Sequence, residues 1–242
     1  MSLTPSLIQE AFEKEGLASF FPPDSLPPLV RYIEKLLQIN QSLNLTRWTS
    51  DEQVLVFHLL DSAWPIRSLP SPGVPGPKWL DLGTGCGFPG VVWAAAFPQW
   101  KVTLMDSVAK KIKALEECLQ GTFPGVSTWT ARAEDLGRDP LHRESFDGVT
   151  ARAVADFRVV LEYAIPLLKV GGYLVNWMTE DQMKLVDNSR SALQALDCQI
   201  VQKTQYQLPG LLQPRYFVTV EKRGKTSDTY PRPVGQPSKR PL

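Results

Sequence analysis

Apolar residues in the first third of the chain recur at the spacing of helix faces. Ile8 and Phe12, for example, fall on one side of a helical wheel. Three stretches show this pattern, at about residues 7–20, 27–43 and 51–63. We therefore expect residues 1–69 to form an all-helical N-terminal cap.

From residue 78 onward, short apolar runs alternate with helical patterns. The expected strands cover residues 78–82, 101–105, 127–131, 146–151 and 172–178, and the expected helices cover 89–97, 107–119, 156–168 and 180–196. Two final strands, at about 199–205 and 215–221, follow without a helix between them. This alternation predicts right-handed crossovers and an α/β fold over residues 78–222. The sheet should have seven strands, mostly parallel, with an antiparallel edge strand.

Proline and charge are unevenly distributed along the chain. Prolines gather between residues 70 and 77, which we interpret as a linker, and again near the C-terminus. The last 21 residues hold six bases and one acid, a formal charge of +5, which leaves −4 for the rest of a chain of net charge +1. Residues 223–242 therefore form a basic, proline-rich tail that cannot fold alone. Two hypotheses remain open: a disordered solubilising end, or an arm that contacts a polyanion.

Composition excludes several classes of protein. No run approaches the roughly 20 apolar residues that a membrane helix needs, and the N-terminus lacks a basic region followed by an apolar block. The three cysteines lie far apart and there are only two histidines, so we expect no metal site. The sequence predicts a cytoplasmic protein with no membrane segment.

A glycine-rich loop follows the first expected strand. Glycines at positions 83, 85, 87 and 90 allow a sharp turn and close approach to a ligand. Gly85-x-Gly87-x-x-Gly90 matches the dinucleotide fingerprint, and Asp106 follows at the spacing of a ribose-binding acid. A purely structural glycine turn is a further alternative.

Three features favour S-adenosylmethionine over a dinucleotide as the ligand of this loop. Asp81 lies two residues before Gly83, where an acid can pair with a cationic amino-acid group. Pro89 removes one backbone donor from the first turn of the following helix, although proline is often tolerated there. The closing pair of strands differs from the repeated half of a dinucleotide domain. Gly85 and Gly87 are thus candidate cofactor contacts.

The ends of the later strands carry further candidate residues. Asp106 can accept both hydroxyls of an adenosine ribose. Ala133 and Glu134 follow the third strand, where they can hold an adenine edge, although Glu134 as a solvated loop acid is an alternative. The fourth strand ends in Arg152 and lacks both an Asn/Asp-Pro-Pro-aromatic turn and a nearby cysteine, which disfavours methylation of base amines and of pyrimidine C5. Arg152 suits phosphate or guanine recognition, with a salt bridge to a neighbouring acid as the alternative.

Taken together, these residues resemble the bacterial small-subunit ribosomal RNA guanine-N7 methyltransferases, also called glucose-inhibited division protein B. The glycine loop alone is generic, but other motifs make the resemblance specific. They are Asn44-Leu45-Thr46, His58-Leu59-Leu60-Asp61-Ser62, Arg132-Ala133-Glu134, Thr150-Ala151-Arg152-Ala153 and the tail that begins Tyr230-Pro231-Arg232-Pro233. Two positions depart from the family: Ile39-Asn40 replaces a Trp-Asn pair, and Met178-Thr179 replaces a Lys-Gly pair.

The resemblance implies a class I, Rossmann-like S-adenosylmethionine-dependent methyltransferase fold behind a helical cap. It implies cofactor contacts at Gly83, Phe88, Asp106, Ala133, Glu134 and Arg152, with Asp106 at the ribose. It also implies RNA contacts at Lys110, Arg132, Arg152 and Arg215. The substrate would be one guanine in the decoding-region loop of 16S ribosomal RNA, free, in the small subunit or in an assembly intermediate. We expect a monomer.

The expected chemistry needs no catalytic acid or base. Guanine N7 carries a lone pair and no proton, so the enzyme's task is to align that nitrogen with the methyl donor. We further expect the tail residues Arg232, Lys239 and Arg240 to contact RNA phosphates. A nucleotide-dependent oxidoreductase and a non-catalytic ribosome-assembly factor are the competing functions.

Overall fold

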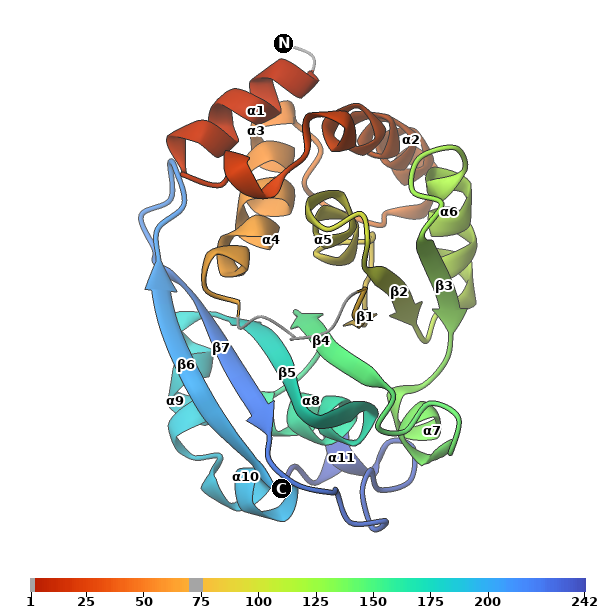
Figure 1. Ribbon diagram of the computed structural model, residues 1–242, viewed down its shortest axis with the longest axis vertical. Helices are drawn as coiled ribbons and strands as arrows, with labels where there is room; N and C mark the ends of the chain where they lie inside the picture. Colours follow the sequence, from red (N-terminus) through yellow and green to blue (C-terminus); the bar gives the residue numbers. More distant parts are fainter. Residues whose placement is uncertain (1–2, 70–75) are drawn as a thin grey trace.

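The computed structural model describes residues 3–69 and 76–242, and residues 70–75 of the expected linker lie outside this description. One sheet of seven strands, in the order β3-β2-β1-β4-β5-β7-β6, runs through the molecule (Figure 1). The strands are β1 Lys78–Leu82, β2 Lys101–Asp106, β3 Val126–Thr130, β4 Phe146–Arg152, β5 Leu168–Met178, β6 Cys198–Tyr206 and β7 Arg215–Lys222.

The predicted fold class is confirmed, with one refinement. Strands β1 to β5 pair in parallel, whereas β7 is antiparallel to both β5 and β6. The antiparallel strand therefore lies one place inside the edge, and β6 forms the edge itself. Because β1 and β4 are neighbours, the chain reverses its winding direction at β1, and the loops at the carboxyl ends of β1 and β4 meet there.

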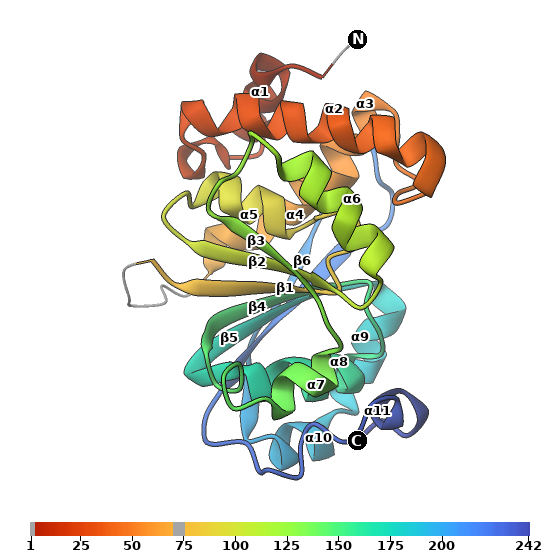
Figure 2. The ribbon, with the colours of Figure 1, turned by 90° about the vertical axis from the view of Figure 1, so that its right-hand side faces the viewer.

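Helices cover both faces of the sheet (Figure 2). On one face lie α5 (Gly90–Ala96) and α6 (Ala109–Leu119), with the N-terminal helices stacked over them. The other face carries α7 (Ala133–Arg138), α8 (Phe157–Ala164), α9 (Glu180–Asp187) and α10 (Arg190–Ala195). A single apolar cluster joins Phe12 of the cap to Trp93 of α5, so the cap shares its core with the sheet domain.

The cap contains the three predicted helices with altered ends. Helix α1 (Pro5–Lys14) ends before Gly16, whose φ is +63°, and a short 3₁₀ turn, η1 (Ala18–Phe20), follows. Helix α2 (Leu26–Leu43) matches the prediction. The third predicted helix begins as α3 (Asp51–Gln53), widens to a π-helical stretch, η3 (Val54–Leu60), and closes as α4 (Asp61–Ala63).

The helices on the other face of the sheet differ from the prediction in two places. Helix α7 was not expected at all, because six residues are too short to show a helical period. The single helix expected at 180–196 is instead α9 and α10, separated at Asn188 and Ser189. Their side chains donate hydrogen bonds to the carbonyls of Lys184 and Leu185, which competes with continuation of the helix.

The C-terminal tail is ordered against the rest of the protein. Residues 223–242 run along α7 and α8 and include a short helix, α11 (Gln236–Lys239), outside that layer (Figure 2). Pro237 is buried in this contact. A disordered end is therefore not what the structure shows. Within the described residues, no helix has the length and apolar character needed to cross a membrane.

Candidate cofactor and substrate site

Asp81, a buried residue near the end of β1, holds the glycine loop in place through hydrogen bonds. Its Oδ2 accepts hydrogen bonds from Thr84 Oγ1 (2.5 Å) and Gly90 N (3.0 Å), and its Oδ1 accepts one from Thr150 Oγ1 (2.9 Å). Burial raises the pKa of this carboxyl from 3.8 to about 6. The side chain has no exposed surface, so the expectation that Asp81 pairs with a cationic ligand group is wrong. Its role is to set the shape of the loop.

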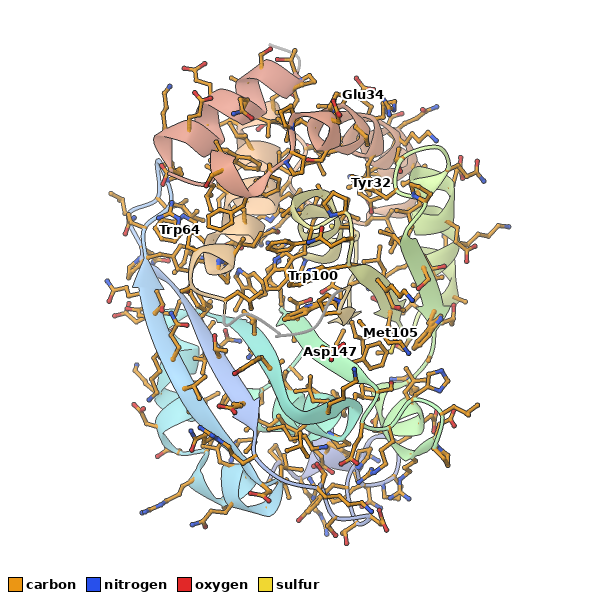
Figure 3. The ribbon with its side chains drawn as sticks, in the orientation of Figure 1. Tyr32, Glu34, Trp64, Trp100, Met105 and Asp147 are labelled. Carbon is orange, nitrogen blue, oxygen red and sulfur yellow. The ribbon has the colours of Figure 1, made fainter. Side chains whose placement is uncertain are left out.

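The loop leaves open space at Gly85. Gly85 has φ +61°, and a Cβ added there would meet only one atom within 4 Å, the Gly83 carbonyl oxygen at 3.9 Å. At Gly87, by contrast, a Cβ would collide with the Tyr32 hydroxyl, which donates a hydrogen bond to the Cys86 carbonyl (2.9 Å; Tyr32 is labelled in Figure 3). Gly87 therefore permits packing against the cap, and Gly85 keeps a cradle free beside the loop.

Asp106 at the end of β2 faces this cradle. Its Oδ2 accepts from Gly85 N (3.2 Å) and from Lys111 Nζ (3.3 Å), and its Oδ1 accepts from Val108 N (3.0 Å). The structure thus brings together two predicted cofactor residues, Gly85 and Asp106, that are 21 positions apart. A cradle without side chains beside a carboxylate fits a nucleoside with vicinal hydroxyls.

Ala133 and Glu134 occupy the first turn of α7. Both are buried, and Glu134 is only 3% exposed, so the solvated loop acid is not observed. The backbone N–H of Ala131 donates to the Asp106 carbonyl (3.2 Å), which links this turn to the end of β2. Glu134 Oε1 accepts a hydrogen bond from Gly235 N of the tail (3.0 Å).

A cavity of about 820 Å³ opens on the cap side of the glycine loop. Of the predicted residues, Phe88, Arg152 and Arg215 line it. Its other walls come from the segment after α2, from η3, from the start of α9 and from residues 210–214. The residues at the cradle, Gly85 and Asp106, are not part of this wall. The loop therefore separates a cradle suited to the cofactor from a cavity large enough for a nucleotide.

Asp61 in the cap organises the arginines of the cavity, and sequence analysis did not single it out. Its carboxylate, 2% exposed, accepts from Arg152 Nη1 (2.9 Å) and from Arg215 Nη2 (3.1 Å) and Nε (3.2 Å). Tyr206 Oη donates to the same group at 2.6 Å. The salt bridge considered for Arg152 is thus present. The signal was the acid inside the motif His58-Leu59-Leu60-Asp61-Ser62, between cap and core.

His58, one turn before Asp61, forms a second part of the cavity wall. Its ring stacks on Phe88, with centroids 4.6 Å apart and an interplanar angle of 14°. Nε2 shares a hydrogen bond with Thr46 Oγ1 at 2.9 Å. Burial, and then the charge of Arg152, lower the pKa of His58 from 6.5 to about 3, so the imidazole is neutral near pH 7.

The remaining predicted RNA contacts differ in their surroundings. Lys110, Arg132, Lys239 and Arg240 are exposed. Arg232 instead points inward, with its Nη2 2.6 Å from Glu162 Oε2 in α8. At the rim of the cavity, Arg47 lies over the Trp48 ring (4.1 Å), which stacks on Phe57 (4.0 Å). This exposed arginine plane is a basic feature that the sequence analysis did not identify.

Comparison of the sequence with known families decides between the ligand classes. The GidB family, described as rRNA small subunit methyltransferase G, matches residues 25–210. This chain belongs to that family. Relatives named ribosomal RNA small subunit methyltransferase G include one from Desulfitobacterium hafniense, 39% identical over 220 residues (90% of each chain). Another, from Streptococcus pneumoniae, is 38% identical over 215 residues, 88% of this chain and 89% of the relative.

Solved structures support the fold alone. A fibrillarin pre-rRNA processing protein from Methanococcus jannaschii aligns with a TM-score of 0.53 and 15% identity over 68% of this chain and 75% of its own. A 16S rRNA (adenine(1408)-N(1))-methyltransferase from Catenulisporales acidiphilia aligns with a TM-score of 0.51 and 15% identity, covering 64% and 89% respectively.

Membership of the GidB family settles the enzyme class. The family consists of S-adenosylmethionine-dependent methyltransferases of small-subunit ribosomal RNA, so the predicted cofactor and enzyme class are confirmed. The dinucleotide interpretation of the glycine loop, and the oxidoreductase that it implied, are wrong. The match begins at residue 25 and so includes α2 and the segment carrying His58 and Asp61.

Proposed function

We propose that this chain methylates N7 of one guanine in a loop of 16S ribosomal RNA, and that the 820 Å³ cavity receives that guanine. The observation that supports this assignment is the shared wall. Phe88 belongs to the glycine loop and stacks with His58 in the wall of the cavity. A base in the cavity therefore lies next to the segment that holds the cofactor.

The cavity residues position the base and do not exchange protons with it. Bound S-adenosylmethionine supplies an electrophilic methyl group, and guanine N7 has no proton to remove. His58 is neutral near pH 7, and Asp61 is held by two arginines and a tyrosine, so neither is poised as a general base. Alignment of donor and acceptor is the contribution that remains.

Arg152 has donors left for the substrate. Among the described residues, its three hydrogen bonds, to Phe57 O (3.0 Å), Asp61 Oδ2 (2.9 Å) and Ser62 Oγ (3.1 Å), all start at Nη1. Nε and Nη2 are therefore available in the cavity for guanine O6 or a phosphate, in the fork geometry that arginine offers to paired acceptors. Asp61 fixes the guanidinium so that the fork keeps its direction.

Further basic side chains extend the RNA surface. We assign the exposed Lys110, Arg132, Lys239 and Arg240, together with Arg215 in the cavity wall, to phosphate contacts. We assign the cradle contacts to Gly83, Gly85, Gly87, Asp106 and the Ala133–Glu134 turn. Arg47 at the rim adds a planar cation against which a loop base can stack. The enzyme acts as a cytoplasmic monomer on the RNA, the small subunit or an assembly intermediate.

A direct assay tests this function. Purified protein, isotopically labelled S-adenosylmethionine and small ribosomal subunits lacking the modification should yield N7-methylguanine at a single nucleotide, identified by mass spectrometry of nuclease fragments. Asp106→Ala is the matched variant, because it removes the cradle carboxylate and leaves the cavity wall intact. Methyl transfer to another atom, or binding of cofactor without any transfer, would contradict the proposal and favour a non-catalytic assembly factor.

A further inference from the structure

The C-terminal segment, residues 226–240, is attached to the enzyme by charged side chains of the core. Arg143, between α7 and β4, donates to the carbonyls of Thr226 (2.7 Å), Ser227 (3.1 Å) and Tyr230 (2.8 Å). Arg138 of α7 donates to the Pro231 carbonyl at 2.8 Å. Two core arginines thus hold the backbone of a segment that has no core of its own.

Arg232 completes this attachment through α8. Its Nε donates to Glu162 Oε1 (2.9 Å), its Nη2 donates to Oε2 (2.6 Å), and its backbone N donates to Oε1 (2.7 Å). Glu162 has no exposed surface. A bidentate pair with a buried carboxylate is among the strongest polar contacts in proteins, and it leaves Arg232 engaged inside the molecule. The expected phosphate contact of Arg232 would require this pair to break.

The far end of the segment contacts α7 and α8, near the expected cofactor residues Ala133 and Glu134. Gly235 N donates to Glu134 Oε1 at 3.0 Å, and Ser238 Oγ lies 2.8 Å from Tyr163 Oη of α8. Glu134 stands in the first turn of α7, directly after the junction whose Ala131 N–H donates to the Asp106 carbonyl. The segment is therefore connected, through the first turn of α7, to the main chain of Asp106, whose side chain borders the cradle.

We propose that residues 226–240 are a positioning segment for S-adenosylmethionine, which fixes the first turn of α7 through Glu134 and thereby sets the adenosine end of the cofactor site. This rests on the proposed cofactor contacts at Ala133, Glu134 and Asp106. The Glu134 carboxylate then serves mainly to hold Gly235, and the peptide groups at Ala133 and Glu134 meet the adenine. The segment acts through these residues and does not itself touch the methyl group.

Thermodynamic linkage gives this idea a test that needs no variant. If docking of the segment raises cofactor affinity, cofactor binding must stabilise the docked segment by the same factor. Hydrogen exchange of the full wild-type chain should therefore slow in residues 230–240 when S-adenosylhomocysteine is added, most clearly at the Gly235 amide, whose N–H is bonded to Glu134. Unchanged exchange in this segment, at saturating S-adenosylhomocysteine, would overturn the proposal.

A pair of full-length variants provides the second test. Arg232→Ala should raise the Kd for S-adenosylhomocysteine by about tenfold, within the usual range of coupling between sites. It should raise the KM for S-adenosylmethionine and leave the KM for the ribosomal substrate unchanged. Arg232→Lys keeps the charge but loses the two-pronged guanidinium. Its Kd for S-adenosylhomocysteine should lie between those of the wild type and Arg232→Ala. Lys225→Ala is the control, because Lys225 is exposed and lies just before the segment in the sequence. Its Kd and both KM values should match those of the wild type.

The outcomes separate this inference from the assignment on which it rests. A wild-type chain that fails to bind S-adenosylhomocysteine would refute the cofactor assignment. A wild-type chain that binds it, with Arg232→Ala binding equally well, would refute the positioning role alone. If Arg232→Ala changes only the substrate KM and the salt dependence of RNA binding, the segment is an RNA arm and our inference is wrong.

Discussion

Replacing Asp61 by asparagine tests the connection between the cap and the cavity. The substitution keeps the shape of the side chain, removes its charge, and turns one acceptor oxygen into an NH₂ group. That group must face donors from Arg152 and Arg215 or from Arg215 and Tyr206, because both carboxylate oxygens are in use. At least one buried polar contact is therefore lost whichever way the amide turns.

The size of the effect follows from the burial of the partners. Removing one member of a fully buried ion pair costs about 3–5 kcal/mol. Asp61 is 2% exposed, but the side chains of Arg152 and Arg215 retain 13% and 25% of their exposure, so water can solvate part of the uncompensated charge. We expect Asp61→Asn to lower the free energy of unfolding by about 2–3 kcal/mol. Because Arg152 would lose its fixed direction, kcat should fall while affinity for S-adenosylhomocysteine is retained.

Urea denaturation at pH 7, followed by tryptophan fluorescence, measures the change in stability. Asp181→Asn is the matched control for stability, because Asp181 makes a short-range pair with Lys184 and its side chain is 91% exposed. Its free energy of unfolding should change by less than about 0.5 kcal/mol. If Asp61→Asn unfolds with the wild-type midpoint and slope, the four hydrogen bonds to this carboxylate contribute nothing net, and our account of the cavity is refuted.

Three further predictions concern the cradle, the cavity and the RNA surface. Gly85→Asp should abolish the calorimetric signal of S-adenosylhomocysteine binding, since its side chain would enter the open cradle beside Asp106; a normal titration would contradict this. His58 has a folded pKa of about 3 against 6.5 unfolded, so its stabilising contribution is complete above pH 6.5 and is lost as the pH falls toward 3. Between pH 7 and 5 the wild type should lose about 2 kcal/mol more unfolding free energy than His58→Gln, and equal losses in urea titrations would show that burial does not hold the imidazole neutral. Lys110→Ala should reduce the slope of log K for RNA binding against log salt concentration by about one, and should leave cofactor affinity unchanged. An unchanged slope would show that Lys110 does not contact RNA.

Local patterns were sufficient to predict the layers of the fold. The alternation of apolar runs and helical periods placed all seven strands, because the pattern of each strand is visible within its own five to eleven residues. The glycine loop and Asp106 were recognisable for the same reason, since strand, loop and helix follow one another directly. The period of residues 51–63 predicted a helix but gave no sign of its π-helical turns, which change the spacing by less than one residue per turn.

Contacts between distant residues explain what the sequence did not show. Asp61 was visible within a motif, but its partners lie 91, 145 and 154 positions later, and no local pattern connects them. The composition of the tail predicted that it cannot fold alone, and in the structure it lies against the core. Its order depends on Glu162 and Glu134, two buried acids of the core, whose pairing with Arg232 and Gly235 is not encoded in the tail itself.

The bonds around Asp61 also have a consequence for synthesis on the ribosome. Asp61 leaves the exit tunnel early, whereas Arg215 is made 154 residues later. At about 5–20 residues per second, this interval lasts roughly 8–30 seconds. Throughout it, the Asp61 carboxylate lacks Arg215, although the apolar partners of the cap in α5 are synthesised early in the interval. The polar wall of the cavity therefore cannot be completed until β7 has been made.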